Sequence, residues 1–169
     1  MITRRAKAIG SCGNGIAVST SPSPNFRHQR VATALTSTIH QALTSEADCQ
    51  RCVVVSELDW HVTSHTVVRP DVLIACGPPP EKHSQQAPAF IAEILSPSTK
   101  DNGLTAKRDL YEANGVRYDA IIDPKLNTLE LLELDATGTY QPARHNETNM
   151  HLLLTDGCSI SVDIDGLFQ

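Results

Sequence analysis

Two acidic residues lie within apolar stretches of this sequence, and they are the first candidates for chemistry. Glu93 occupies the middle of the run Ala89–Leu95, which prolines bound on both sides. A charged carboxylate in a buried strand must be paired, protonated or bound to a metal, because burying it alone costs several kcal/mol. Asp71 lies in a second such run, Val67–Ala75. Two acids on neighbouring strands can hold a divalent cation between them.

Side chains alternate between the two faces of a strand, so Asp71 and Glu93 can converge if their strands are adjacent. Their oxygen-rich setting favours a hard cation such as Mg²⁺, or Mn²⁺ in its place, which keeps several waters for chemistry. The backbone carbonyl of Ile94 is the simplest further protein ligand. We therefore expect Asp71, Glu93 and Ile94 to be the metal ligands.

Many phosphodiesterases also need a lysine near the metal to hold the attacking water and to offset charge on the phosphate. Leu95 occupies the strand position that such a lysine would take, two residues beyond Glu93. In the helix expected next, Leu104, Lys107 and Tyr111 fall on one stripe. Lys107 flanks the buried face and can reach inward along its stem. The expected catalytic residues are thus Asp71, Glu93 and Lys107.

Each of these residues also has a structural interpretation. A buried acid can belong to an ion pair that only stabilises the fold. Glu93 would then pair with Arg69 or Lys107, and Asp71 would be a strand-edge carboxylate after a proline. Lys107 would be a solvated helix lysine, and Tyr111 is expected to pack in the core rather than to act in catalysis. A histidine in the first turn of a helix, His28, is more often structural than functional.

The cysteines indicate a reducing compartment. Their number, five, is odd and argues against a complete set of disulfides, so we expect a cytoplasmic protein. Cys49 and Cys52 have a spacing seen in zinc sites, and His61 and His65 could supply further ligands. No second cysteine pair follows at the usual distance, so zinc is a weaker alternative than magnesium.

The elements that would position these residues form an α/β pattern in a single domain, residues 1–169, with a partly irregular segment over 1–24. The periodicity predicts helices over 26–45 and 103–114. It predicts strands over 16–18, 52–55, 67–76, 89–96, 116–122, 128–134, 151–154 and 159–164. Helices and strands in this order predict a mixed central sheet flanked by helices.

Composition narrows the function classes. No stretch is long and apolar enough to span a membrane. The net charge is −5 and the pI about 5.7, which argues against tight, nonspecific DNA binding by the whole surface but allows a local basic cleft. The best local group of basic residues along the chain is Lys100, Lys107 and Arg108, which a solvated face explains equally well.

The chain resembles the Uma2 family over residues 14–169. The resemblance rests on Pro70-Asp71, the block Ala92-Glu93-Ile94-Leu95-Ser96-Pro97-Ser98-Thr99, Lys107, Tyr111, Gly115-Val116, Tyr118 and Asp123-Pro124. It implies the restriction-endonuclease-like fold of the PD-(D/E)XK nucleases, with the lysine moved from the strand to the following helix. The implied function is a Mg²⁺-dependent (or Mn²⁺-dependent) endonuclease-like hydrolase acting on DNA, without membrane association. A homodimer is expected by analogy with nucleases that address both strands.

The sequence departs from the family pattern near its beginning. Family members have an N-terminal glutamate that joins the active site, whereas the matching segment, Ser11–Ile16, has no acid. The alternative is therefore a catalytically weak or inactive member of the fold that serves as a nucleic-acid-binding or self-associating module.

Overall fold

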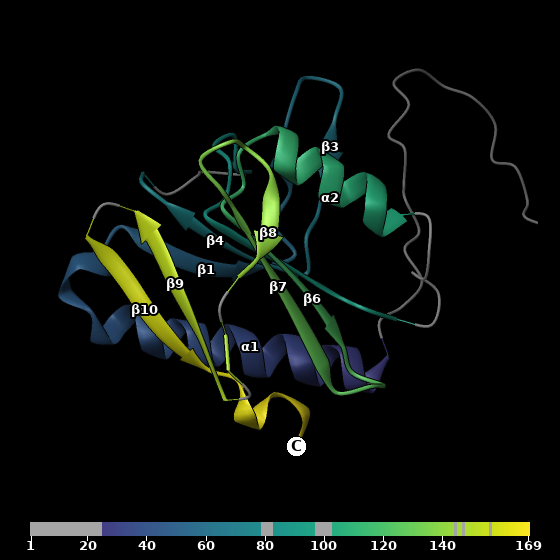
Figure 1. Cartoon of the computed structure of the whole chain (residues 1–169), viewed down its shortest axis with the longest axis vertical. Helices are drawn as coiled ribbons and strands as arrows, with labels where there is room; N and C mark the ends of the chain where they lie inside the picture. Colours follow the sequence, from purple (N-terminus) through teal and green to yellow (C-terminus); the bar gives the residue numbers. More distant parts are fainter. Residues whose placement is uncertain (1–24, 79–82, 97–102, 144, 147, 156) are drawn as a thin grey trace, which may run out of the picture.

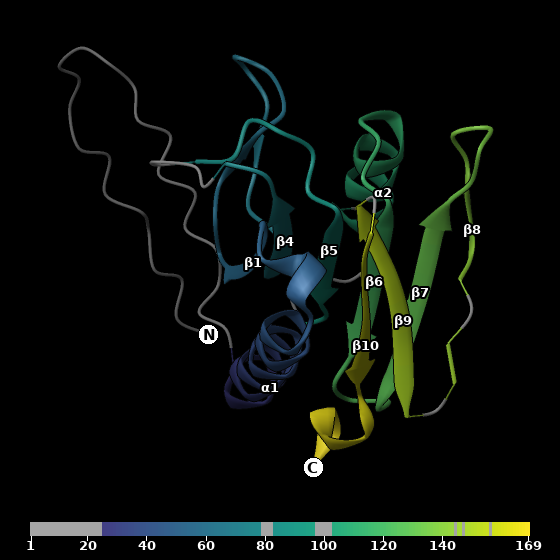
Figure 2. The same ribbon diagram turned by 90° about the vertical axis from the view of Figure 1, so that its left-hand side faces the viewer.

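The computed structural model describes residues 25–78, 83–96, 103–143, 145–146, 148–155 and 157–169. The strand expected over 16–18 lies outside these residues. Two α-helices, α1 (Phe26–Ser45) and α2 (Gly103–Ala113), accompany a central sheet (Figures 1 and 2). The strands are β1 (Cys52–Ser56), β2 (Trp60–His61), β3 (Val67–Val68), β4 (Val72–Cys76), β5 (Phe90–Ile94), β6 (Tyr118–Asp123), β7 (Thr128–Leu134), β8 (Tyr140–Pro142), β9 (Asn149–Thr155) and β10 (Cys158–Asp163). Short 3-10 helices, η1 (Ala47–Cys49) and η2 (Asp165–Phe168), follow α1 and β10.

The central sheet has six strands in the order β1-β4-β5-β6-β7-β8. Only β5 and β6 run parallel; the other neighbours are antiparallel. A parallel pair needs a crossover connection, and α2 lies in the chain between these two strands. The carboxyl ends of β5 and β6 therefore meet at one edge of the sheet. The fold is the expected mixed α/β architecture.

Each face of the sheet has its own hydrophobic cluster. Alternate residues of β4, β5 and β6, such as Ile74, Ala92 and Ile122, pack with α1 and the β9–β10 hairpin in the larger cluster. The opposite face contributes Leu73 and Ile91 to a smaller cluster with Trp60, Tyr111 and Val116. The two sides of β5 thus face different layers, and Glu93 shares the α2 side with Ile91.

Helix α1 begins where the sequence predicts it. The side chain of Asn25 accepts a hydrogen bond from the backbone N–H of His28 at 3.0 Å, which caps the first turn. Val31, Leu35, Ile39 and other buried residues recur at three- and four-residue steps and face the sheet. This cap fixes His28 in the first turn, and the side chain of His28 is buried.

The expected strand over 67–76 is wrong in one respect, because it is two strands. Arg69, Pro70 and Asp71 separate β3 from β4. Proline has no N–H to give to a ladder and is excluded from the interior of a central strand. Strands β2 and β8 were missed because they have only two and three residues. The β9–β10 hairpin forms its own two-stranded sheet and does not join the central one.

The cysteines also differ from the expectation. Cys49 is joined to Cys158, which ties η1 to β10, and Cys52 is joined to Cys76 across the β1–β4 pair. The fifth, Cys12, lies outside the described residues. An odd number of cysteines therefore did not exclude disulfides, because four of the five can still form two pairs.

Candidate functional site

Glu93 lies on β5 with its carboxylate facing α2, and only 7% of the residue is exposed. Both carboxylate oxygens accept hydrogen bonds from Lys107 Nζ, at 2.9 and 2.8 Å. The hydroxyl of Tyr111 donates to Glu93 Oε1 at 2.6 Å. Burial raises the pKa of Glu93, and the charge of Asp71 acts in the same direction, while Lys107 and Tyr111 oppose the shift. Glu93 is thus a buried carboxylate that two residues of α2 hold in place, and its pKa depends on the charges around it.

Helix α2 supplies both partners of Glu93 because Lys107 and Tyr111 are four residues apart and share one face of the helix. The Tyr111 ring is fully buried in the smaller cluster, where it lies 6.0 Å from Trp60. Burial raises the pKa of Tyr111 far above its usual value, with Glu93 adding to the shift, so the hydroxyl stays protonated as a donor. The Lys107 side chain remains 35% exposed. Tyr111 therefore anchors Glu93, while the ammonium group stays within reach of solvent.

Asp71 precedes β4 and lies opposite Glu93. Val72 pairs with Ala92 in the antiparallel ladder, so one further step along both chains brings Asp71 and Glu93 together. Asp71 Oδ2 accepts a hydrogen bond from the backbone N–H of Ile94 at 2.7 Å. This bond continues the β4–β5 connection past the end of the ladder and fixes the carboxylate beside Glu93.

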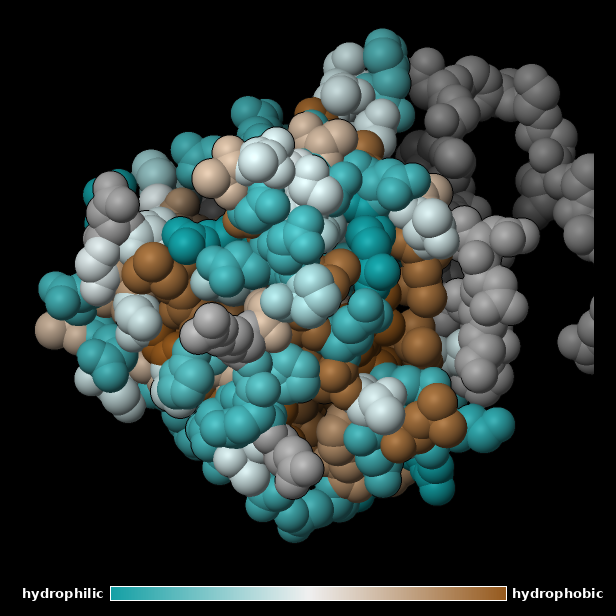
Figure 3. All heavy atoms as spheres, viewed as in Figure 1, coloured by the Kyte–Doolittle hydropathy of each residue, from teal (hydrophilic) through white to brown (hydrophobic). Residues whose placement is uncertain are grey.

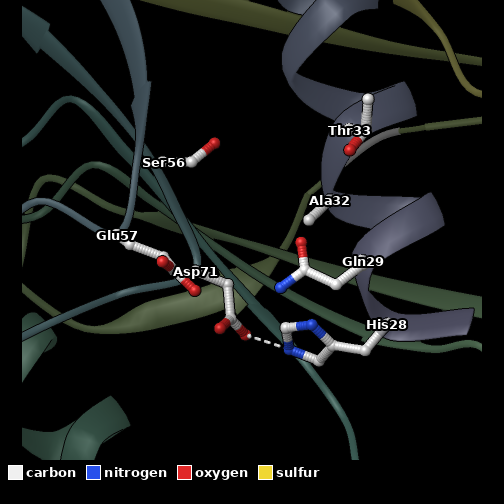
Figure 4. A pocket seen from close by; sticks show the side chains of 7 residues that line it. All are labelled: His28, Gln29, Ala32, Thr33, Ser56, Glu57 and Asp71. Atoms are coloured by element: carbon white, nitrogen blue, oxygen red, sulfur yellow. Dashed lines mark ion pairs between the residues drawn. The ribbon is translucent and has the colours of Figure 1, made fainter. Parts of the chain in front are cut away.

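His28 forms the second contact of Asp71. Its Nε2 lies 3.2 Å from the same oxygen, Asp71 Oδ2 (Figure 4). The other ring nitrogen, Nδ1, is buried and has no hydrogen-bond partner in the part of the chain that the structure describes. Among the described residues, both contacts of the Asp71 carboxylate engage Oδ2, so Oδ1 is the oxygen available to a ligand. The helix cap that fixes His28 thus also helps to orient Asp71.

A pocket of about 160 Å³ opens beside Asp71, between α1 and the end of β1. Gln29 and Thr33 line it from the helix, and Ser56 and Glu57 line it from the other side (Figure 4). Glu57 has a positive φ of 53°, which is uncommon for a residue with a side chain, and its N–H donates to the Asp71 carbonyl at 3.1 Å. Sequence analysis missed Glu57 because it lies outside any apolar run, although it adds a carboxylate next to Asp71.

A second buried acid, Asp119, lies under α2 on β6. Asp119 is paired in register with Ile91, on the same side of the sheet as Glu93. Burial raises the pKa of Asp119 to about 6, and the nearby guanidinium of Arg108, 3.4 Å away, offsets part of the shift. Arg108 also contacts Glu130 at 3.0 Å. These groups form a network behind the site, and sequence analysis did not identify Asp119 as part of it.

The structure brings Asp71, Glu93 and Lys107 together at one edge of the sheet. It also decides between the partners considered for Glu93, because Arg69 pairs with Asp59 at 2.7 Å instead. The zinc alternative is wrong, since Cys49 and Cys52 are both in disulfides. Ile94 contributes its N–H to Asp71, and metal ligation by its carbonyl stays a prediction. Within the described part of the chain, no group of three or more His, Cys, Asp or Glu side chains is arranged to hold a metal.

The donor set nevertheless fits a magnesium-type ion. Mg²⁺ in proteins is usually bound by one or two carboxylates and keeps several waters, so it does not need three acidic or histidine ligands. Asp71 offers an oxygen that its hydrogen bonds leave open, and Glu93 is the second carboxylate. Burial is the main cause of the raised pKa of Glu93, and a cation between the two acids would also offset the smaller contribution from the charge of Asp71. The pair is thus suited to a hard divalent cation.

Comparisons with known proteins bear on the family and on the fold. The model of the Uma2 family, described as "Putative restriction endonuclease", matches residues 11–164. A crystal structure of "a putative nuclease belonging to DUF820" from Anabaena variabilis ATCC 29413 has a similar fold, with a TM-score of 0.68. The two chains are 17% identical, and the match covers 87% of this chain and 83% of the other. No curated protein gives a significant match to the sequence. Neither helix in the described residues is both long and apolar enough to cross a membrane.

Proposed function

The chain belongs to the Uma2 family, and we propose that it is a Mg²⁺- or Mn²⁺-dependent endonuclease that hydrolyses phosphodiester bonds in DNA. One observation carries the proposal. Asp71 and Glu93 lie opposite each other where β4 and β5 meet, with the ammonium group of Lys107 2.8 Å from Glu93. Two carboxylates and one partly exposed lysine are the groups that metal-assisted phosphodiester hydrolysis needs.

Asp71 and Glu93 would hold the cation, together with the carbonyl of Ile94. Such a cation would neutralise charge on the phosphate and make a water molecule more acidic. Tyr111 keeps Glu93 Oε1 in place, and His28 with the Ile94 N–H keeps Asp71 Oδ2 in place. These contacts hold the two carboxylates before a ligand arrives, which lowers the cost of ordering them on binding.

Lys107 would act on the phosphate. Its ammonium group contacts Glu93, and about a third of its side chain is exposed. The side chain can therefore approach a phosphate oxygen by rotating about its own bonds, without any change in helix α2. A cation there stabilises the negative charge that develops during attack. Its loss should lower turnover more than it lowers substrate binding, because the charge it opposes grows only in the transition state.

Cleavage of a supercoiled plasmid tests the proposal. Wild-type protein with Mg²⁺ or Mn²⁺ should convert the plasmid to nicked and linear forms, and chelator should stop the reaction. Glu93→Gln should be inactive with either metal, and so should Lys107→Met. Arg117→Met is the matched control, because Arg117 forms a partly exposed ion pair with Glu133 just before β6, at the opposite end of the parallel β5–β6 pair from Glu93. Activity that survives in Glu93→Gln would show that another site or a contaminant cleaves the plasmid.

The second candidate function is a non-catalytic module that binds nucleic acid or associates with a second copy. The absence of an acid in Ser11–Ile16 favours it. The Lys107–Glu93 pair also favours it, because a lysine that already satisfies a buried carboxylate fits a structural role. A wild-type chain that binds DNA but cleaves neither plasmid nor oligonucleotide with any divalent metal would make this the better account.

A further inference from the structure

The distribution of positive charge identifies a surface outside the acidic site. The described residues include eight lysine and arginine side chains: Arg27, Arg30, Arg51, Arg69, Lys107, Arg108, Arg117 and Lys125. Four of them are paired with carboxylates, namely Arg69, Lys107, Arg108 and Arg117. Of the other four, three line a single groove. Cations without acidic partners are thus concentrated in one place within this part of the chain.

This basic groove, defined by Phe26, Arg27, Arg30, Val31, Pro124, Lys125, Asn127 and Phe168, has a volume of about 440 Å³. It lies where the start of α1, the β6–β7 turn and η2 come together (Figure 1). None of the described residues that line it is acidic, and α1 has no acidic residue in its first turn. The positive end of the helix dipole therefore adds to the charge of the side chains.

The groove is built in advance of any ligand. Arg30 donates to the carbonyl of Phe168 at 2.7 Å, which fixes its guanidinium group against η2. On the other wall the buried carboxylate of Asp123 accepts from the N–H groups of Lys125 and Leu126, at 2.8 and 3.2 Å. The Asp123 carboxylate therefore bonds to the backbone of its own turn, and the Lys125 side chain is exposed.

An exposed aromatic ring completes the groove. Phe26 is 80% exposed, which is unusual for a large apolar side chain at a helix start. In the view of Figure 3, hydrophobic and hydrophilic side chains lie together at the lower right, where Figure 1 has the β6–β7 turn and the start of α1. Sites for single-stranded nucleic acid combine a positively charged groove with aromatic rings on which bases stack.

The groove and the acidic site both border the first turn of α1. Arg27 of the groove precedes His28, which contacts Asp71. On the sheet side the N–H of Leu95, just past the end of β5, donates to the Ile122 carbonyl at 2.8 Å, two residues before Pro124. The groove therefore lies near the acidic site, along the neighbouring face of the first turns of α1.

We propose that this basic groove binds a single-stranded stretch of nucleic acid adjacent to the phosphodiester at the acidic site, an inference that rests on the proposed nuclease function. Arg27, Arg30 and Lys125 contact successive phosphates, and Phe26 stacks on a base. The chain as a whole is negatively charged, with a net charge of −5, so its overall field opposes DNA binding. Binding must therefore depend on a local surface of this kind.

The test is fluorescence anisotropy of a labelled single-stranded 20-mer with the full chain in chelator, where no cleavage occurs. Each phosphate contact contributes about 0.7 to the slope of log K against log salt concentration for single strands. The triple variant Arg27→Gln/Arg30→Gln/Lys125→Gln should lose about 2 from that slope, and its affinity at 50 mM salt should fall by at least about tenfold. Arg51→Gln is the matched control, because Arg51 is the one unpaired described cation outside the groove.

Two further variants separate the contribution of the positive charges to binding from that of the Phe26 ring. Arg27→Gln/Lys125→Gln keeps the Arg30–Phe168 contact, so its effect cannot come from loss of that contact. Phe26→Ala should weaken binding of the 20-mer about tenfold but leave binding of an abasic chain of the same length unchanged. A triple variant that binds as the wild type does, or an Arg51→Gln effect as large per charge, would overturn the proposal. So would a wild-type chain that binds an acidic peptide but not the oligonucleotide.

Binding and cleavage experiments test the basic groove and the proposed nuclease activity independently. Loss of oligonucleotide binding in the groove variants, with no cleavage by the wild type under any metal, supports the groove and refutes the nuclease. Metal-dependent cleavage by the wild type, with unchanged binding and cleavage in the triple variant, supports the nuclease and overturns the groove.

Discussion

Removing the ammonium group of Lys107 should destabilise the protein in the absence of metal. Removing one partner of a buried ion pair costs about 3–5 kcal/mol, because the other charge is left without compensation. Lys107 is 35% exposed, and Tyr111 still donates to Glu93 after the change. Solvent screening and the remaining hydrogen bond reduce the expected loss to about 2 kcal/mol for Lys107→Met at pH 7. For a chain of this length that loss lowers the melting temperature by about 4–8 °C.

The assay is urea unfolding of a double-mutant cycle in chelator. Glu93→Gln removes the charge that Lys107 compensates, so Lys107→Met should cost much less in the Glu93→Gln background than in the wild type. We expect a coupling energy of about 1–2 kcal/mol. The control cycle uses Arg69 and Asp59, whose exposed pair should show a coupling energy below about 1 kcal/mol. If Lys107→Met costs the same with and without Glu93, the buried-pair reasoning is wrong.

Three other predictions concern His28, Asp119 and the Cys49–Cys158 disulfide. His28→Ala should weaken Mn²⁺ binding about ten- to a hundredfold in calorimetric titration, and His28→Gln, which retains a donor near Asp71, should recover part of the loss. The pKa of Asp119 is raised to about 6 in the folded protein, so the folded state binds more protons than the unfolded state between about pH 4 and 6. The free energy of unfolding therefore falls as the pH rises through this range. Asp119→Asn should flatten this pH dependence in unfolding curves, by up to about 3 kcal/mol. The Cys49–Cys158 bond closes a loop with a sequence separation of 109 residues, so chain entropy gives a loss of about 4.8 kcal/mol for Cys49→Ala/Cys158→Ala in urea unfolding, and reductant should remove the difference from the wild type.

Sequence patterns predicted the parts of the fold that depend on local periodicity. Helix α1 follows from the Asn25 cap and from the repeat of Val31, Leu35 and Ile39, which the structure buries against the sheet. The acid on β5 was identifiable for a different reason, because a carboxylate within an apolar run has a high desolvation cost and needs a partner. Such signals lie within a few residues of one another and can be read without knowing the fold.

The missed features depend on contacts between distant segments. The contact of His28 with Asp71 joins residues 43 apart (71 − 28), and nothing local to either residue predicts it. The basic groove combines Arg27 with Lys125, whereas the chain's most compact basic group, at residues 100–108, includes two side chains that the structure pairs with acids. Proximity along the sequence does not show which cations lack an acidic partner, because that depends on which acids the fold places beside them.

Anomalous diffraction from a crystal grown with Mn²⁺ can show whether Asp71 and Glu93 bind a metal ion. We expect one strong peak between the two carboxylates, and no peak there in crystals of Asp71→Asn. A peak elsewhere, or no bound ion in a wild-type crystal at millimolar Mn²⁺, would contradict the claim that these two acids form a metal site.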